Sequence, residues 1–537
     1  MHVPACAIAY PFSYMPVPID PSFRPGSYWP AASAPIAPRE NRETRQLGRL
    51  RVDPYAWMKF IPPSGSRTLE TLPAQLRRHL EDEMRYAQEV LHPLQADAAD
   101  LLARMVQRSP AVVEPPPVFS GGWHYARRLP AGAAHPVFHR AKSNGDDQTL
   151  FDEAERARGH AYYRATGHQP SADDRYYAWA EDVRGDDRHC ICVLDMQTGI
   201  VRTVVQADAF GYGGFTFSAS SRYLYWIWRD AYSRPTRLYR TSVEGGEAVL
   251  VHEEHDPAMF MQVTRTAANG FVVLTIAGPD TSEVRLIPAV AETDEPLLVR
   301  PRRRGTRYEV NEWNGKLLML TDADGAADRK LLELDPVDFS LRAERVPHRP
   351  GIPILAIVPF AAGLVRIERV KELHRLVLMR CDGSETTVSF DEPAYSIELA
   401  DTQSYDARHV RIVHQTPARP PRWIDIALDS GKCQVVAEAG MSGHDAAIYQ
   451  VERLYAKGAD GETVPITVLS RRDVPAGTPQ PLLLTGYGAY GISREPVFSL
   501  PATVLVDTGF RYALRRREYP CEQNILINYA GAEIKTA

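Results

Sequence analysis

Residues 481–493 read PLLLTGYGAYGIS, an apolar run that ends in alternating glycine and tyrosine. This pattern predicts a buried strand that opens into a loop whose backbone passes close to another group, because glycine permits close approach. A glycine-rich turn at the end of a buried strand is a common ligand site in α/β proteins. A tight turn without a ligand is the alternative interpretation of the same residues.

The residues on either side extend the α/β pattern. Residues 451–469 contain two alternating strands that flank Asp460-Gly461, a dipeptide typical of a hairpin turn. After the apolar run, residues 500–507 are expected to form a helix and residues 510–514 the next strand. The C-terminal part of the chain therefore begins a sheet with a helix between two of its strands.

Between residues 116 and 445, short alternating strands recur at an even period. Residues 171–179 (SADDRYYAW) are echoed 47 residues later by residues 218–226 (SASSRYLYW). Later strands, at steps of 46, 47 and 46 residues, carry the markers Leu274, Leu320, Ile367 and Val413. A period of roughly 40–50 residues with several strands per unit is typical of propeller blades. The count predicts a β-propeller of seven blades, whereas a pair of stacked sandwiches would not explain the even spacing.

The N-terminal part has a different character. Residues 1–50 are irregular and rich in proline, and we expect part of them to be disordered. Residues 51–115 are expected to form a helical segment, in which Thr71 can cap one helix and a second helix lies near residues 97–107. The run Pro115-Pro116-Pro117 marks the boundary to the propeller.

Composition excludes several classes of protein. The 537 residues are 44% hydrophobic and 24% charged with a net charge of −5, so no nucleic-acid partner is expected. No apolar run reaches the ~18 residues of a membrane helix, and residues 1–38 lack the pattern of a signal peptide. The six cysteines are too scattered for a disulfide framework, which favours a reducing, cytoplasmic location.

The pair Cys190 and Cys192 suggests a metal site, and the pair His252 and His255 is a second, equally weak candidate. Alternation places both cysteine side chains on one face of a strand, but no second cysteine pair follows elsewhere. A structural role is therefore favoured, and neither a metal nor another cofactor is expected.

The order of hairpin, linker, apolar strand and glycine-rich loop closely resembles the start of the hydrolase domain in the prolyl oligopeptidase family of serine peptidases, and the oligopeptidase B branch especially. The residues that carry this resemblance are Glu452-Arg453-Leu454, Asp460-Gly461, Val464-Pro465-Ile466, residues 481–496 and Phe498-Ser499. Near the N-terminus, Asp53-Pro54-Tyr55-Ala56-Trp57 is similar to an element at the start of oligopeptidase chains. The resemblance implies a seven-bladed propeller that caps an active site and admits only short peptides.

The expected architecture has four parts. They are an irregular N-terminus (1–50), a helical segment packed on the hydrolase domain (51–115), the propeller (116–445) and an incomplete α/β-hydrolase domain (446–537). In the last part, the resemblance fades after about residue 510.

Hydrolysis in this family needs a nucleophilic serine in a G-x-S-x-G elbow, together with a histidine and an acid. The sequence contains no such elbow, since Gly440-Met441-Ser442-Gly443 places glycine directly after the serine. Family members carry the nucleophile, acid and histidine downstream of the glycine-rich loop, and this sequence reaches Ala537 without them. We expect a frameshift, a premature stop or a fragmentary gene model, in preference to a genuine non-catalytic form.

By resemblance, Tyr487 donates its hydroxyl to the oxyanion of the tetrahedral intermediate, and Tyr490 lines the substrate pocket. The alternative is that both tyrosines only pack. The expected function is hydrolysis of short peptides by the serine oligopeptidase family, with cleavage after basic residues and after proline both left open and this chain itself inactive. The alternative function is a non-catalytic propeller that binds peptides or a protein partner.

Overall fold

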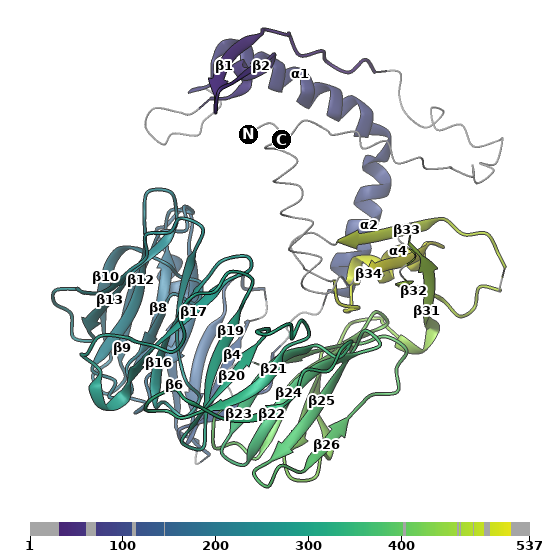
Figure 1. The fold of residues 1–537 in the computed structure, drawn as a ribbon. Helices are drawn as coiled ribbons and strands as arrows, with labels where there is room; N and C mark the ends of the chain where they lie inside the picture. The colour runs from purple at the N-terminus through teal and green to yellow at the C-terminus, as the bar shows by residue number, and fades with distance from the viewer. Residues whose placement is uncertain are drawn as a thin grey trace. The chain divides into compact units, whose positions relative to one another are not determined.

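The computed structural model describes residues 32–60, 71–109, 114–130, 132–143, 145–400, 404–458, 461, 463–475, 477–487 and 494–516. The chain (Figure 1) consists of two compact units, and the boundary between them lies between Gln107 and Arg108. Tyr490 and residues 517–537 lie outside the described residues. Among the residues that are described, no helix is long and apolar enough to cross a membrane.

The first unit contains a hairpin and two helices. Strands β1 (Arg42–Gln46) and β2 (Arg49–Asp53) pair in antiparallel fashion, and the short helix η2 (Ala56–Met58) follows. The 3-10 helix η4 (His92–Leu94) joins helix α1 (Ala74–Leu91) to helix α2 (Gln95–Arg108), the last residue of which begins the second unit.

Residues 1–50 were expected to be irregular, but residues 42–53 form this hairpin, which extends across the boundary predicted at residue 50. Its turn is Leu47-Gly48, and both residues have positive φ, 52° and 75°. Such a turn matches the twist of paired strands, but asparagine or glycine normally fills its first position. Because leucine occupies this first position, the sequence did not indicate a turn here.

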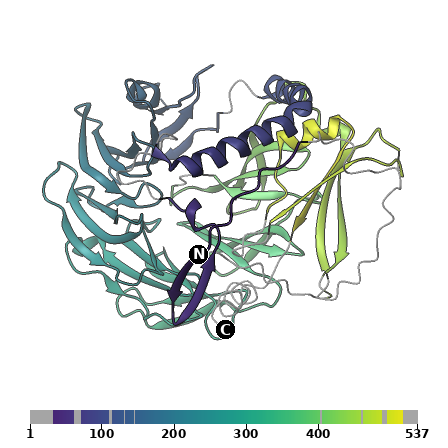
Figure 2. The same cartoon turned by 90° about the horizontal axis from the view of Figure 1, so that it is seen from above.

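The second unit begins with antiparallel four-stranded sheets that follow one another in chain order (Figures 1 and 2). The first sheet contains β3 (Val118–Ser120), β4 (Trp123–Arg128), β5 (Val137–Ala141) and β6 (Asp147–Asp152), followed by the short helix α3 (Glu153–Ala157). Next comes an eight-stranded sheet of β7 (Arg164–Pro170), β8 (Tyr176–Asp182), β9 (His189–Asp195), β10 (Ile200–Ala209), β11 (Phe215–Phe217), β12 (Tyr223–Arg229), β13 (Pro235–Ser242) and β14 (Val249–Glu253). Only the pair Ala209 and Trp228 joins β10 to β12, so this sheet consists of two four-stranded meanders.

Four further four-stranded sheets continue the series. The first contains β15 (Phe260–Arg265), β16 (Phe271–Ala277), β17 (Ser282–Pro288) and β18 (Leu297–Leu298), and the second contains β19 (Tyr308–Trp313), β20 (Lys316–Thr321), β21 (Lys330–Leu334) and β22 (Leu341–Val346). The third contains β23 (Ile354–Phe360), β24 (Gly363–Val370), β25 (Leu373–Arg380) and β26 (Glu385–Val388). The fourth contains β27 (Ser396–Leu399), β28 (His409–Thr416), β29 (Arg419–Ala427) and β30 (Cys433–Glu438). The period read from the sequence is explained, since its four markers lie in the second strand of these sheets, β16, β20, β24 and β28.

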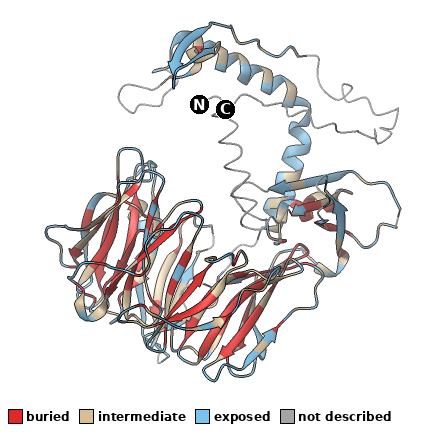
Figure 3. Cartoon of the chain, in the orientation of Figure 1, coloured by how far each residue is buried: buried red, intermediate tan, exposed pale blue. Residues whose placement is uncertain are grey.

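Apolar side chains of neighbouring sheets pack against one another and form the core, as the buried strand centres in Figure 3 show. One cluster, for example, joins Val284 and Leu286 of β17 to Val310 and Leu317 of the next sheet. The last sheet is tied to the segment before β3 by Arg411, whose Nη1 donates to the carbonyl oxygen of Pro117 at 2.7 Å. These contacts support the β-propeller that the even period predicted.

The C-terminal sheet contains β31 (Tyr449–Lys457), β32 (Thr463–Arg471), β33 (Leu482–Tyr487) and β34 (Arg511–Arg516), in the order β31-β32-β34-β33. The predicted hairpin is β31–β32, and the predicted helix is α4 (Leu500–Asp507), which connects the parallel strands β33 and β34. The buried strand expected at residues 482–484 is instead exposed, because β33 lies at the edge of the described sheet. Its leucines are 41–56% exposed.

Candidate functional site

Tyr487 is the last residue of β33, at the carboxyl end of this strand. It pairs with Arg516 of β34, and its side chain is 41% exposed. The loop that follows, including Tyr490, lies outside the described residues. Of the two predicted site residues, the structure therefore describes Tyr487 alone. It lies at the carboxyl end of a parallel strand, which is where α/β proteins commonly bind ligands.

The register of the sheet shows which face Tyr487 shares. Paired residues of neighbouring strands point to the same side, so Thr485 and Tyr487 lie on the face of Tyr512 and Leu514. The Thr485 hydroxyl donates to the Tyr512 hydroxyl at 3.1 Å across this face. On β32, Thr467 and Leu469 pair with Leu514 and Tyr512 and continue the same surface.

This face borders a cavity of about 460 Å³ between the C-terminal sheet and the last propeller sheet. The sheet contributes Thr467, Leu469, Tyr512 and Leu514, and the propeller contributes Glu398 and Pro417. Residues 494–499 complete the lining with Arg494 and Glu495 among them. Thr485 pairs with Leu514, which lines the cavity. Tyr487 lies two residues further along β33 on the same face, so it is next to the cavity lining and not part of it.

Ion pairs fix the cavity walls against each other. Arg369 of β24 donates to Glu495 at 2.6 Å, and Nε2 of His374 lies 3.5 Å from the same carboxylate. Arg453 of β31 donates to Glu372 at 2.9 Å. The turn between β24 and β25 thus holds both the segment before α4 and the first strand of the C-terminal sheet.

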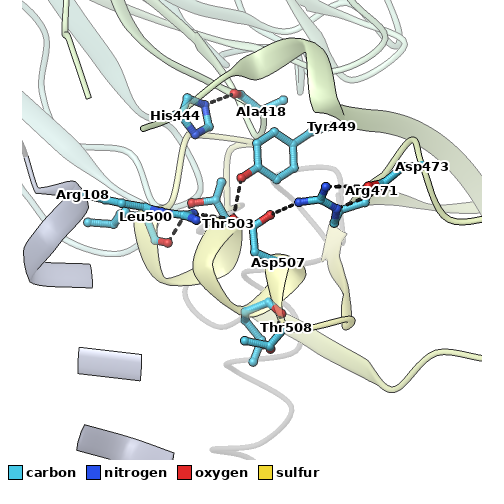
Figure 4. A network of polar contacts seen from close by, with 11 residues as sticks. Arg108, Ala418, His444, Tyr449, Arg471, Asp473, Leu500, Thr503, Asp507 and Thr508 are labelled. Carbon is cyan, nitrogen blue, oxygen red and sulfur yellow. Dashed lines mark hydrogen bonds and ion pairs between the residues drawn. The ribbon is translucent and has the colours of Figure 1, made fainter. Parts of the chain in front are cut away.

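Asp507, the last residue of α4, is the centre of a second polar network (Figure 4). Its buried carboxylate accepts hydrogen bonds from Tyr449 and Arg471, each at 2.9 Å, and pairs with Arg108. Burial and the bond to Asp507 raise the pKa of Tyr449 to about 12, so this phenol keeps its proton. The network positions α4 and β31 beside the cavity, and nothing in the sequence pattern singled out Asp507.

Ser499 is the serine that lines the cavity, and its hydroxyl oxygen accepts from the backbone N–H of Ala502 at 3.3 Å. This bond caps the first turn of α4, so Ser499 has a structural role. The Tyr487 phenol can donate to an oxygen that gains charge, but a donor without a nucleophile breaks no peptide bond.

One group of potential metal ligands comes together among the described residues: Glu181, Cys190 and Cys192. The prediction that Cys190 and Cys192 share a strand face is confirmed on β9. Glu181 on the neighbouring strand β8 had no signal in the sequence, because its approach depends on strand pairing.

Comparison with known proteins places these features in a family. The profile described as "Prolyl oligopeptidase, N-terminal beta-propeller domain" matches residues 35–439. Protease 2 of Moraxella lacunata is 28% identical over 491 residues, which cover 88% of this chain and 69% of that protein. Dipeptidyl aminopeptidase BI of Pseudoxanthomonas mexicana is 27% identical, with 87% of this chain and 66% of that protein covered.

The chain thus spans about two thirds of the length of these two relatives. Among solved structures, Oligopeptidase B from Leishmania major superposes with a TM-score of 0.79 at 23% identity, over 90% of this chain and 71% of that one. At this identity the likeness shows the shared fold.

Proposed function

Since the chain belongs to the prolyl oligopeptidase family, we propose that it is the peptide-binding part of a serine peptidase that acts on short peptides. The observation that carries the proposal is the register of β33, which puts Tyr487 on the sheet face that borders the cavity beside the propeller. Tyr487 then serves as oxyanion donor and Tyr490 as a wall of the substrate pocket. The relatives named as peptidases support this reading.

The proposed architecture assigns the sheets to domains. The five four-stranded sheets and the meanders β7–β10 and β11–β14 are seven propeller blades over residues 116–445. Residues 446–537 begin an α/β-hydrolase domain, which the order β31-β32-β34-β33 and the parallel β33–α4–β34 unit support. Residues 1–50 and 51–115 form the N-terminal segments that precede the propeller.

The chain by itself binds peptides and does not hydrolyse them. Its 537 residues contain no G-x-S-x-G elbow, so the serine that family chemistry requires has no candidate in this sequence. The cavity wall carries the exposed carboxylate of Glu398, which can pair with a basic residue of a peptide, and the exposed guanidinium of Arg494 lines the same cavity. We take the Glu398 carboxylate as the partner of a basic residue, which favours such peptides over those with proline. A propeller that binds a protein partner without any catalytic role is the second candidate, supported by the same missing elbow.

Calorimetric titration of the purified chain with matched short peptides that differ in one residue (Arg, Pro or Ala) tests the proposal. The Arg peptide should bind best, and Glu398→Gln should weaken it by about fivefold, the equivalent of roughly 1 kcal/mol for a partly exposed charge pair. Glu244→Gln, an exposed carboxylate in a turn, is the control and should change nothing. If none of the peptides binds while the chain melts cooperatively, the peptide-binding role is wrong and the protein-partner alternative is favoured.

A further inference from the structure

Strands β8 and β9 bring two thiols and a carboxylate to one face of a sheet, away from the cavity described above. Cys190 pairs with Glu181 and Cys192 pairs with Trp179, so all four side chains project from the same face. Glu181 and Cys192 are buried, and Cys190 is partly exposed. Both cysteines are free thiols.

The three ligand atoms already have the spacing of a metal site. Oε1 of Glu181 lies 3.7 Å from Sγ of Cys190 and 3.5 Å from Sγ of Cys192, and all three atoms lie within 4.8 Å of one another. A tetrahedral ion with metal–sulfur distances of about 2.3 Å and metal–oxygen distances of about 2.0–2.2 Å separates its oxygen and sulfur ligands by roughly 3.5–3.7 Å. The side chains would therefore need little rearrangement around such an ion.

The carboxylate is also oriented in the way that metal ligands are. Its other oxygen, Oε2, accepts from the Tyr163 hydroxyl at 2.6 Å and from Nε1 of Trp179 at 3.0 Å. These two donors turn Oε1 toward the thiols. Hydrogen bonds of this kind, which hold a ligand from behind, are a regular part of protein metal sites.

A cation already occupies this position. The Arg156 guanidinium donates to Oε1 of Glu181 at 2.6 Å and lies 3.8 Å from Sγ of Cys192. The Arg156 side chain is 38% exposed, comes from the short helix α3, and lines a cavity of about 500 Å³ together with Trp179. Displacement of this side chain would leave a buried carboxylate that needs another positive charge.

We propose that Cys190, Cys192 and Glu181 bind a thiophilic divalent cation of the zinc class, in exchange for the Arg156 guanidinium. The ion forms bonds to the two sulfurs and to Oε1, both thiol protons leave to solvent, and a water molecule takes the fourth position. Two sulfurs with one oxygen favour zinc, cobalt or cadmium over magnesium or calcium, which prefer oxygen ligands. The site is independent of peptide binding, because it lies on the β8–β9 face of the propeller.

Titration of the reduced, purified chain with Co²⁺ tests the site, since cobalt–thiolate bonds absorb in the ultraviolet and tetrahedral cobalt absorbs in the visible. One ion per chain should bind, Zn²⁺ should displace it, and Cys190→Ala should abolish the thiolate absorption. The double variant Cys381→Ala/Cys433→Ala removes two exposed thiols and is the matched control, which should bind as the unchanged chain does.

Two more variants separate a built site from chance binding or misfolding. Arg156→Ala removes the competing cation and should tighten Co²⁺ binding without lowering the melting temperature of the metal-free chain, which distinguishes this effect from thiols exposed by damage to the fold. Tyr163→Phe frees the carboxylate and should weaken binding about tenfold. Absence of stoichiometric Co²⁺ binding, binding that persists in Cys190→Ala, or weaker binding in Arg156→Ala would each overturn the proposal.

Discussion

At the scale of single residues, Glu368 is a buried charge of the propeller that is held by three arginines. Its carboxylate is fully buried and pairs with Arg366 and Arg375, each at 2.5 Å, and with Arg349. Burial alone would raise the pKa of Glu368, but the hydrogen bonds from these arginines outweigh it and lower the pKa below its ordinary value. Arg366 and Glu368 lie on β24 and Arg375 on β25, whereas Arg349 lies between β22 and β23, so the cluster also joins this sheet to the segment that leads into it.

Glu368→Gln should therefore destabilise the propeller strongly. The change keeps the volume of the side chain but removes one of the two charges that compensate Arg366, whose side chain is 1% exposed and also pairs with Glu385. Loss of one partner from a buried pair costs about 3–5 kcal/mol. Thermal unfolding followed by circular dichroism measures the effect, and Asp324→Asn, in an exposed pair with Lys330, is the control. Equal stability of Glu368→Gln and the unchanged chain would show that the cluster contributes nothing.

Buried histidines should make the fold sensitive to mild acid. Burial, with the nearby charge of Arg127, lowers the pKa of His168 to about 3, and burial lowers that of His414 to about 4. An unfolded histidine titrates near pH 6.5. Between these values the unfolded chain binds protons that the folded chain does not, so stability falls as the pH drops below about 6.5, by at most ~1.4 kcal/mol per pH unit for each histidine.

His168→Phe tests this dependence. The ring of His168 stacks on Phe138 with centroids 4.0 Å apart, and its buried Nδ1 has no hydrogen-bond partner among the described residues, so phenylalanine fits the position. The melting temperature of the variant should fall less between pH 7 and pH 5 than that of the unchanged chain. His160→Phe, at an exposed position, should leave the dependence as it was. An unaltered slope in His168→Phe would contradict the assignment.

At the scale of elements, the sequence echo at 47 residues has a physical cause. Ser171 and Ser218 occupy the same place in two turns, where each hydroxyl oxygen accepts from a backbone N–H five residues on, at 2.9 and 3.2 Å. Asp174 and Ser221 follow with positive φ in both turns. Turn chemistry and alternation therefore made the propeller strands predictable.

Strand β33 shows where such prediction stops. Three consecutive leucines indicated a buried strand, but apolar character does not tell which neighbours a strand has in the sheet. Leu482, Leu483 and Leu484 are largely exposed at the edge of the described sheet. For the same reason, Glu181 and Arg156 could not be joined to Cys190 and Cys192 from sequence, because strand pairing and helix placement bring them together.

The position of β33 at the edge of the sheet formed by the described residues predicts self-association. Unpaired apolar strands are templates for pairing with another chain. The double variant Leu482→Lys/Leu484→Lys changes two residues on one face of β33 and should reduce self-association, measured by light scattering, with little change in melting temperature. Val468→Lys, at a buried position of β32, should instead unfold the sheet. Unchanged association of the double variant would mean that β33 is not the contact.

At the scale of the whole molecule, two groups of ionic contacts hold the elements that carry the candidate cavity. Glu495 and Arg453 link the C-terminal sheet to the turn between β24 and β25, and Asp507 joins α4 to Arg108 and Arg471. The sequence predicted a strand at residues 482–484 with Tyr487 in the loop after it, and the structure extends this strand to Tyr487. The cavity lining was not predicted, because Glu398 and Leu514 lie on strands more than a hundred residues apart.

The most direct test is hydrolysis of short chromogenic peptides containing Arg, Lys or Pro by the purified 537-residue chain, with parallel labelling by a fluorophosphonate. If the chain binds peptides but lacks an elbow serine, we expect no turnover and no labelled serine, while the Arg peptide still binds. Turnover together with labelling would contradict this, because a serine outside any G-x-S-x-G elbow would then be the nucleophile.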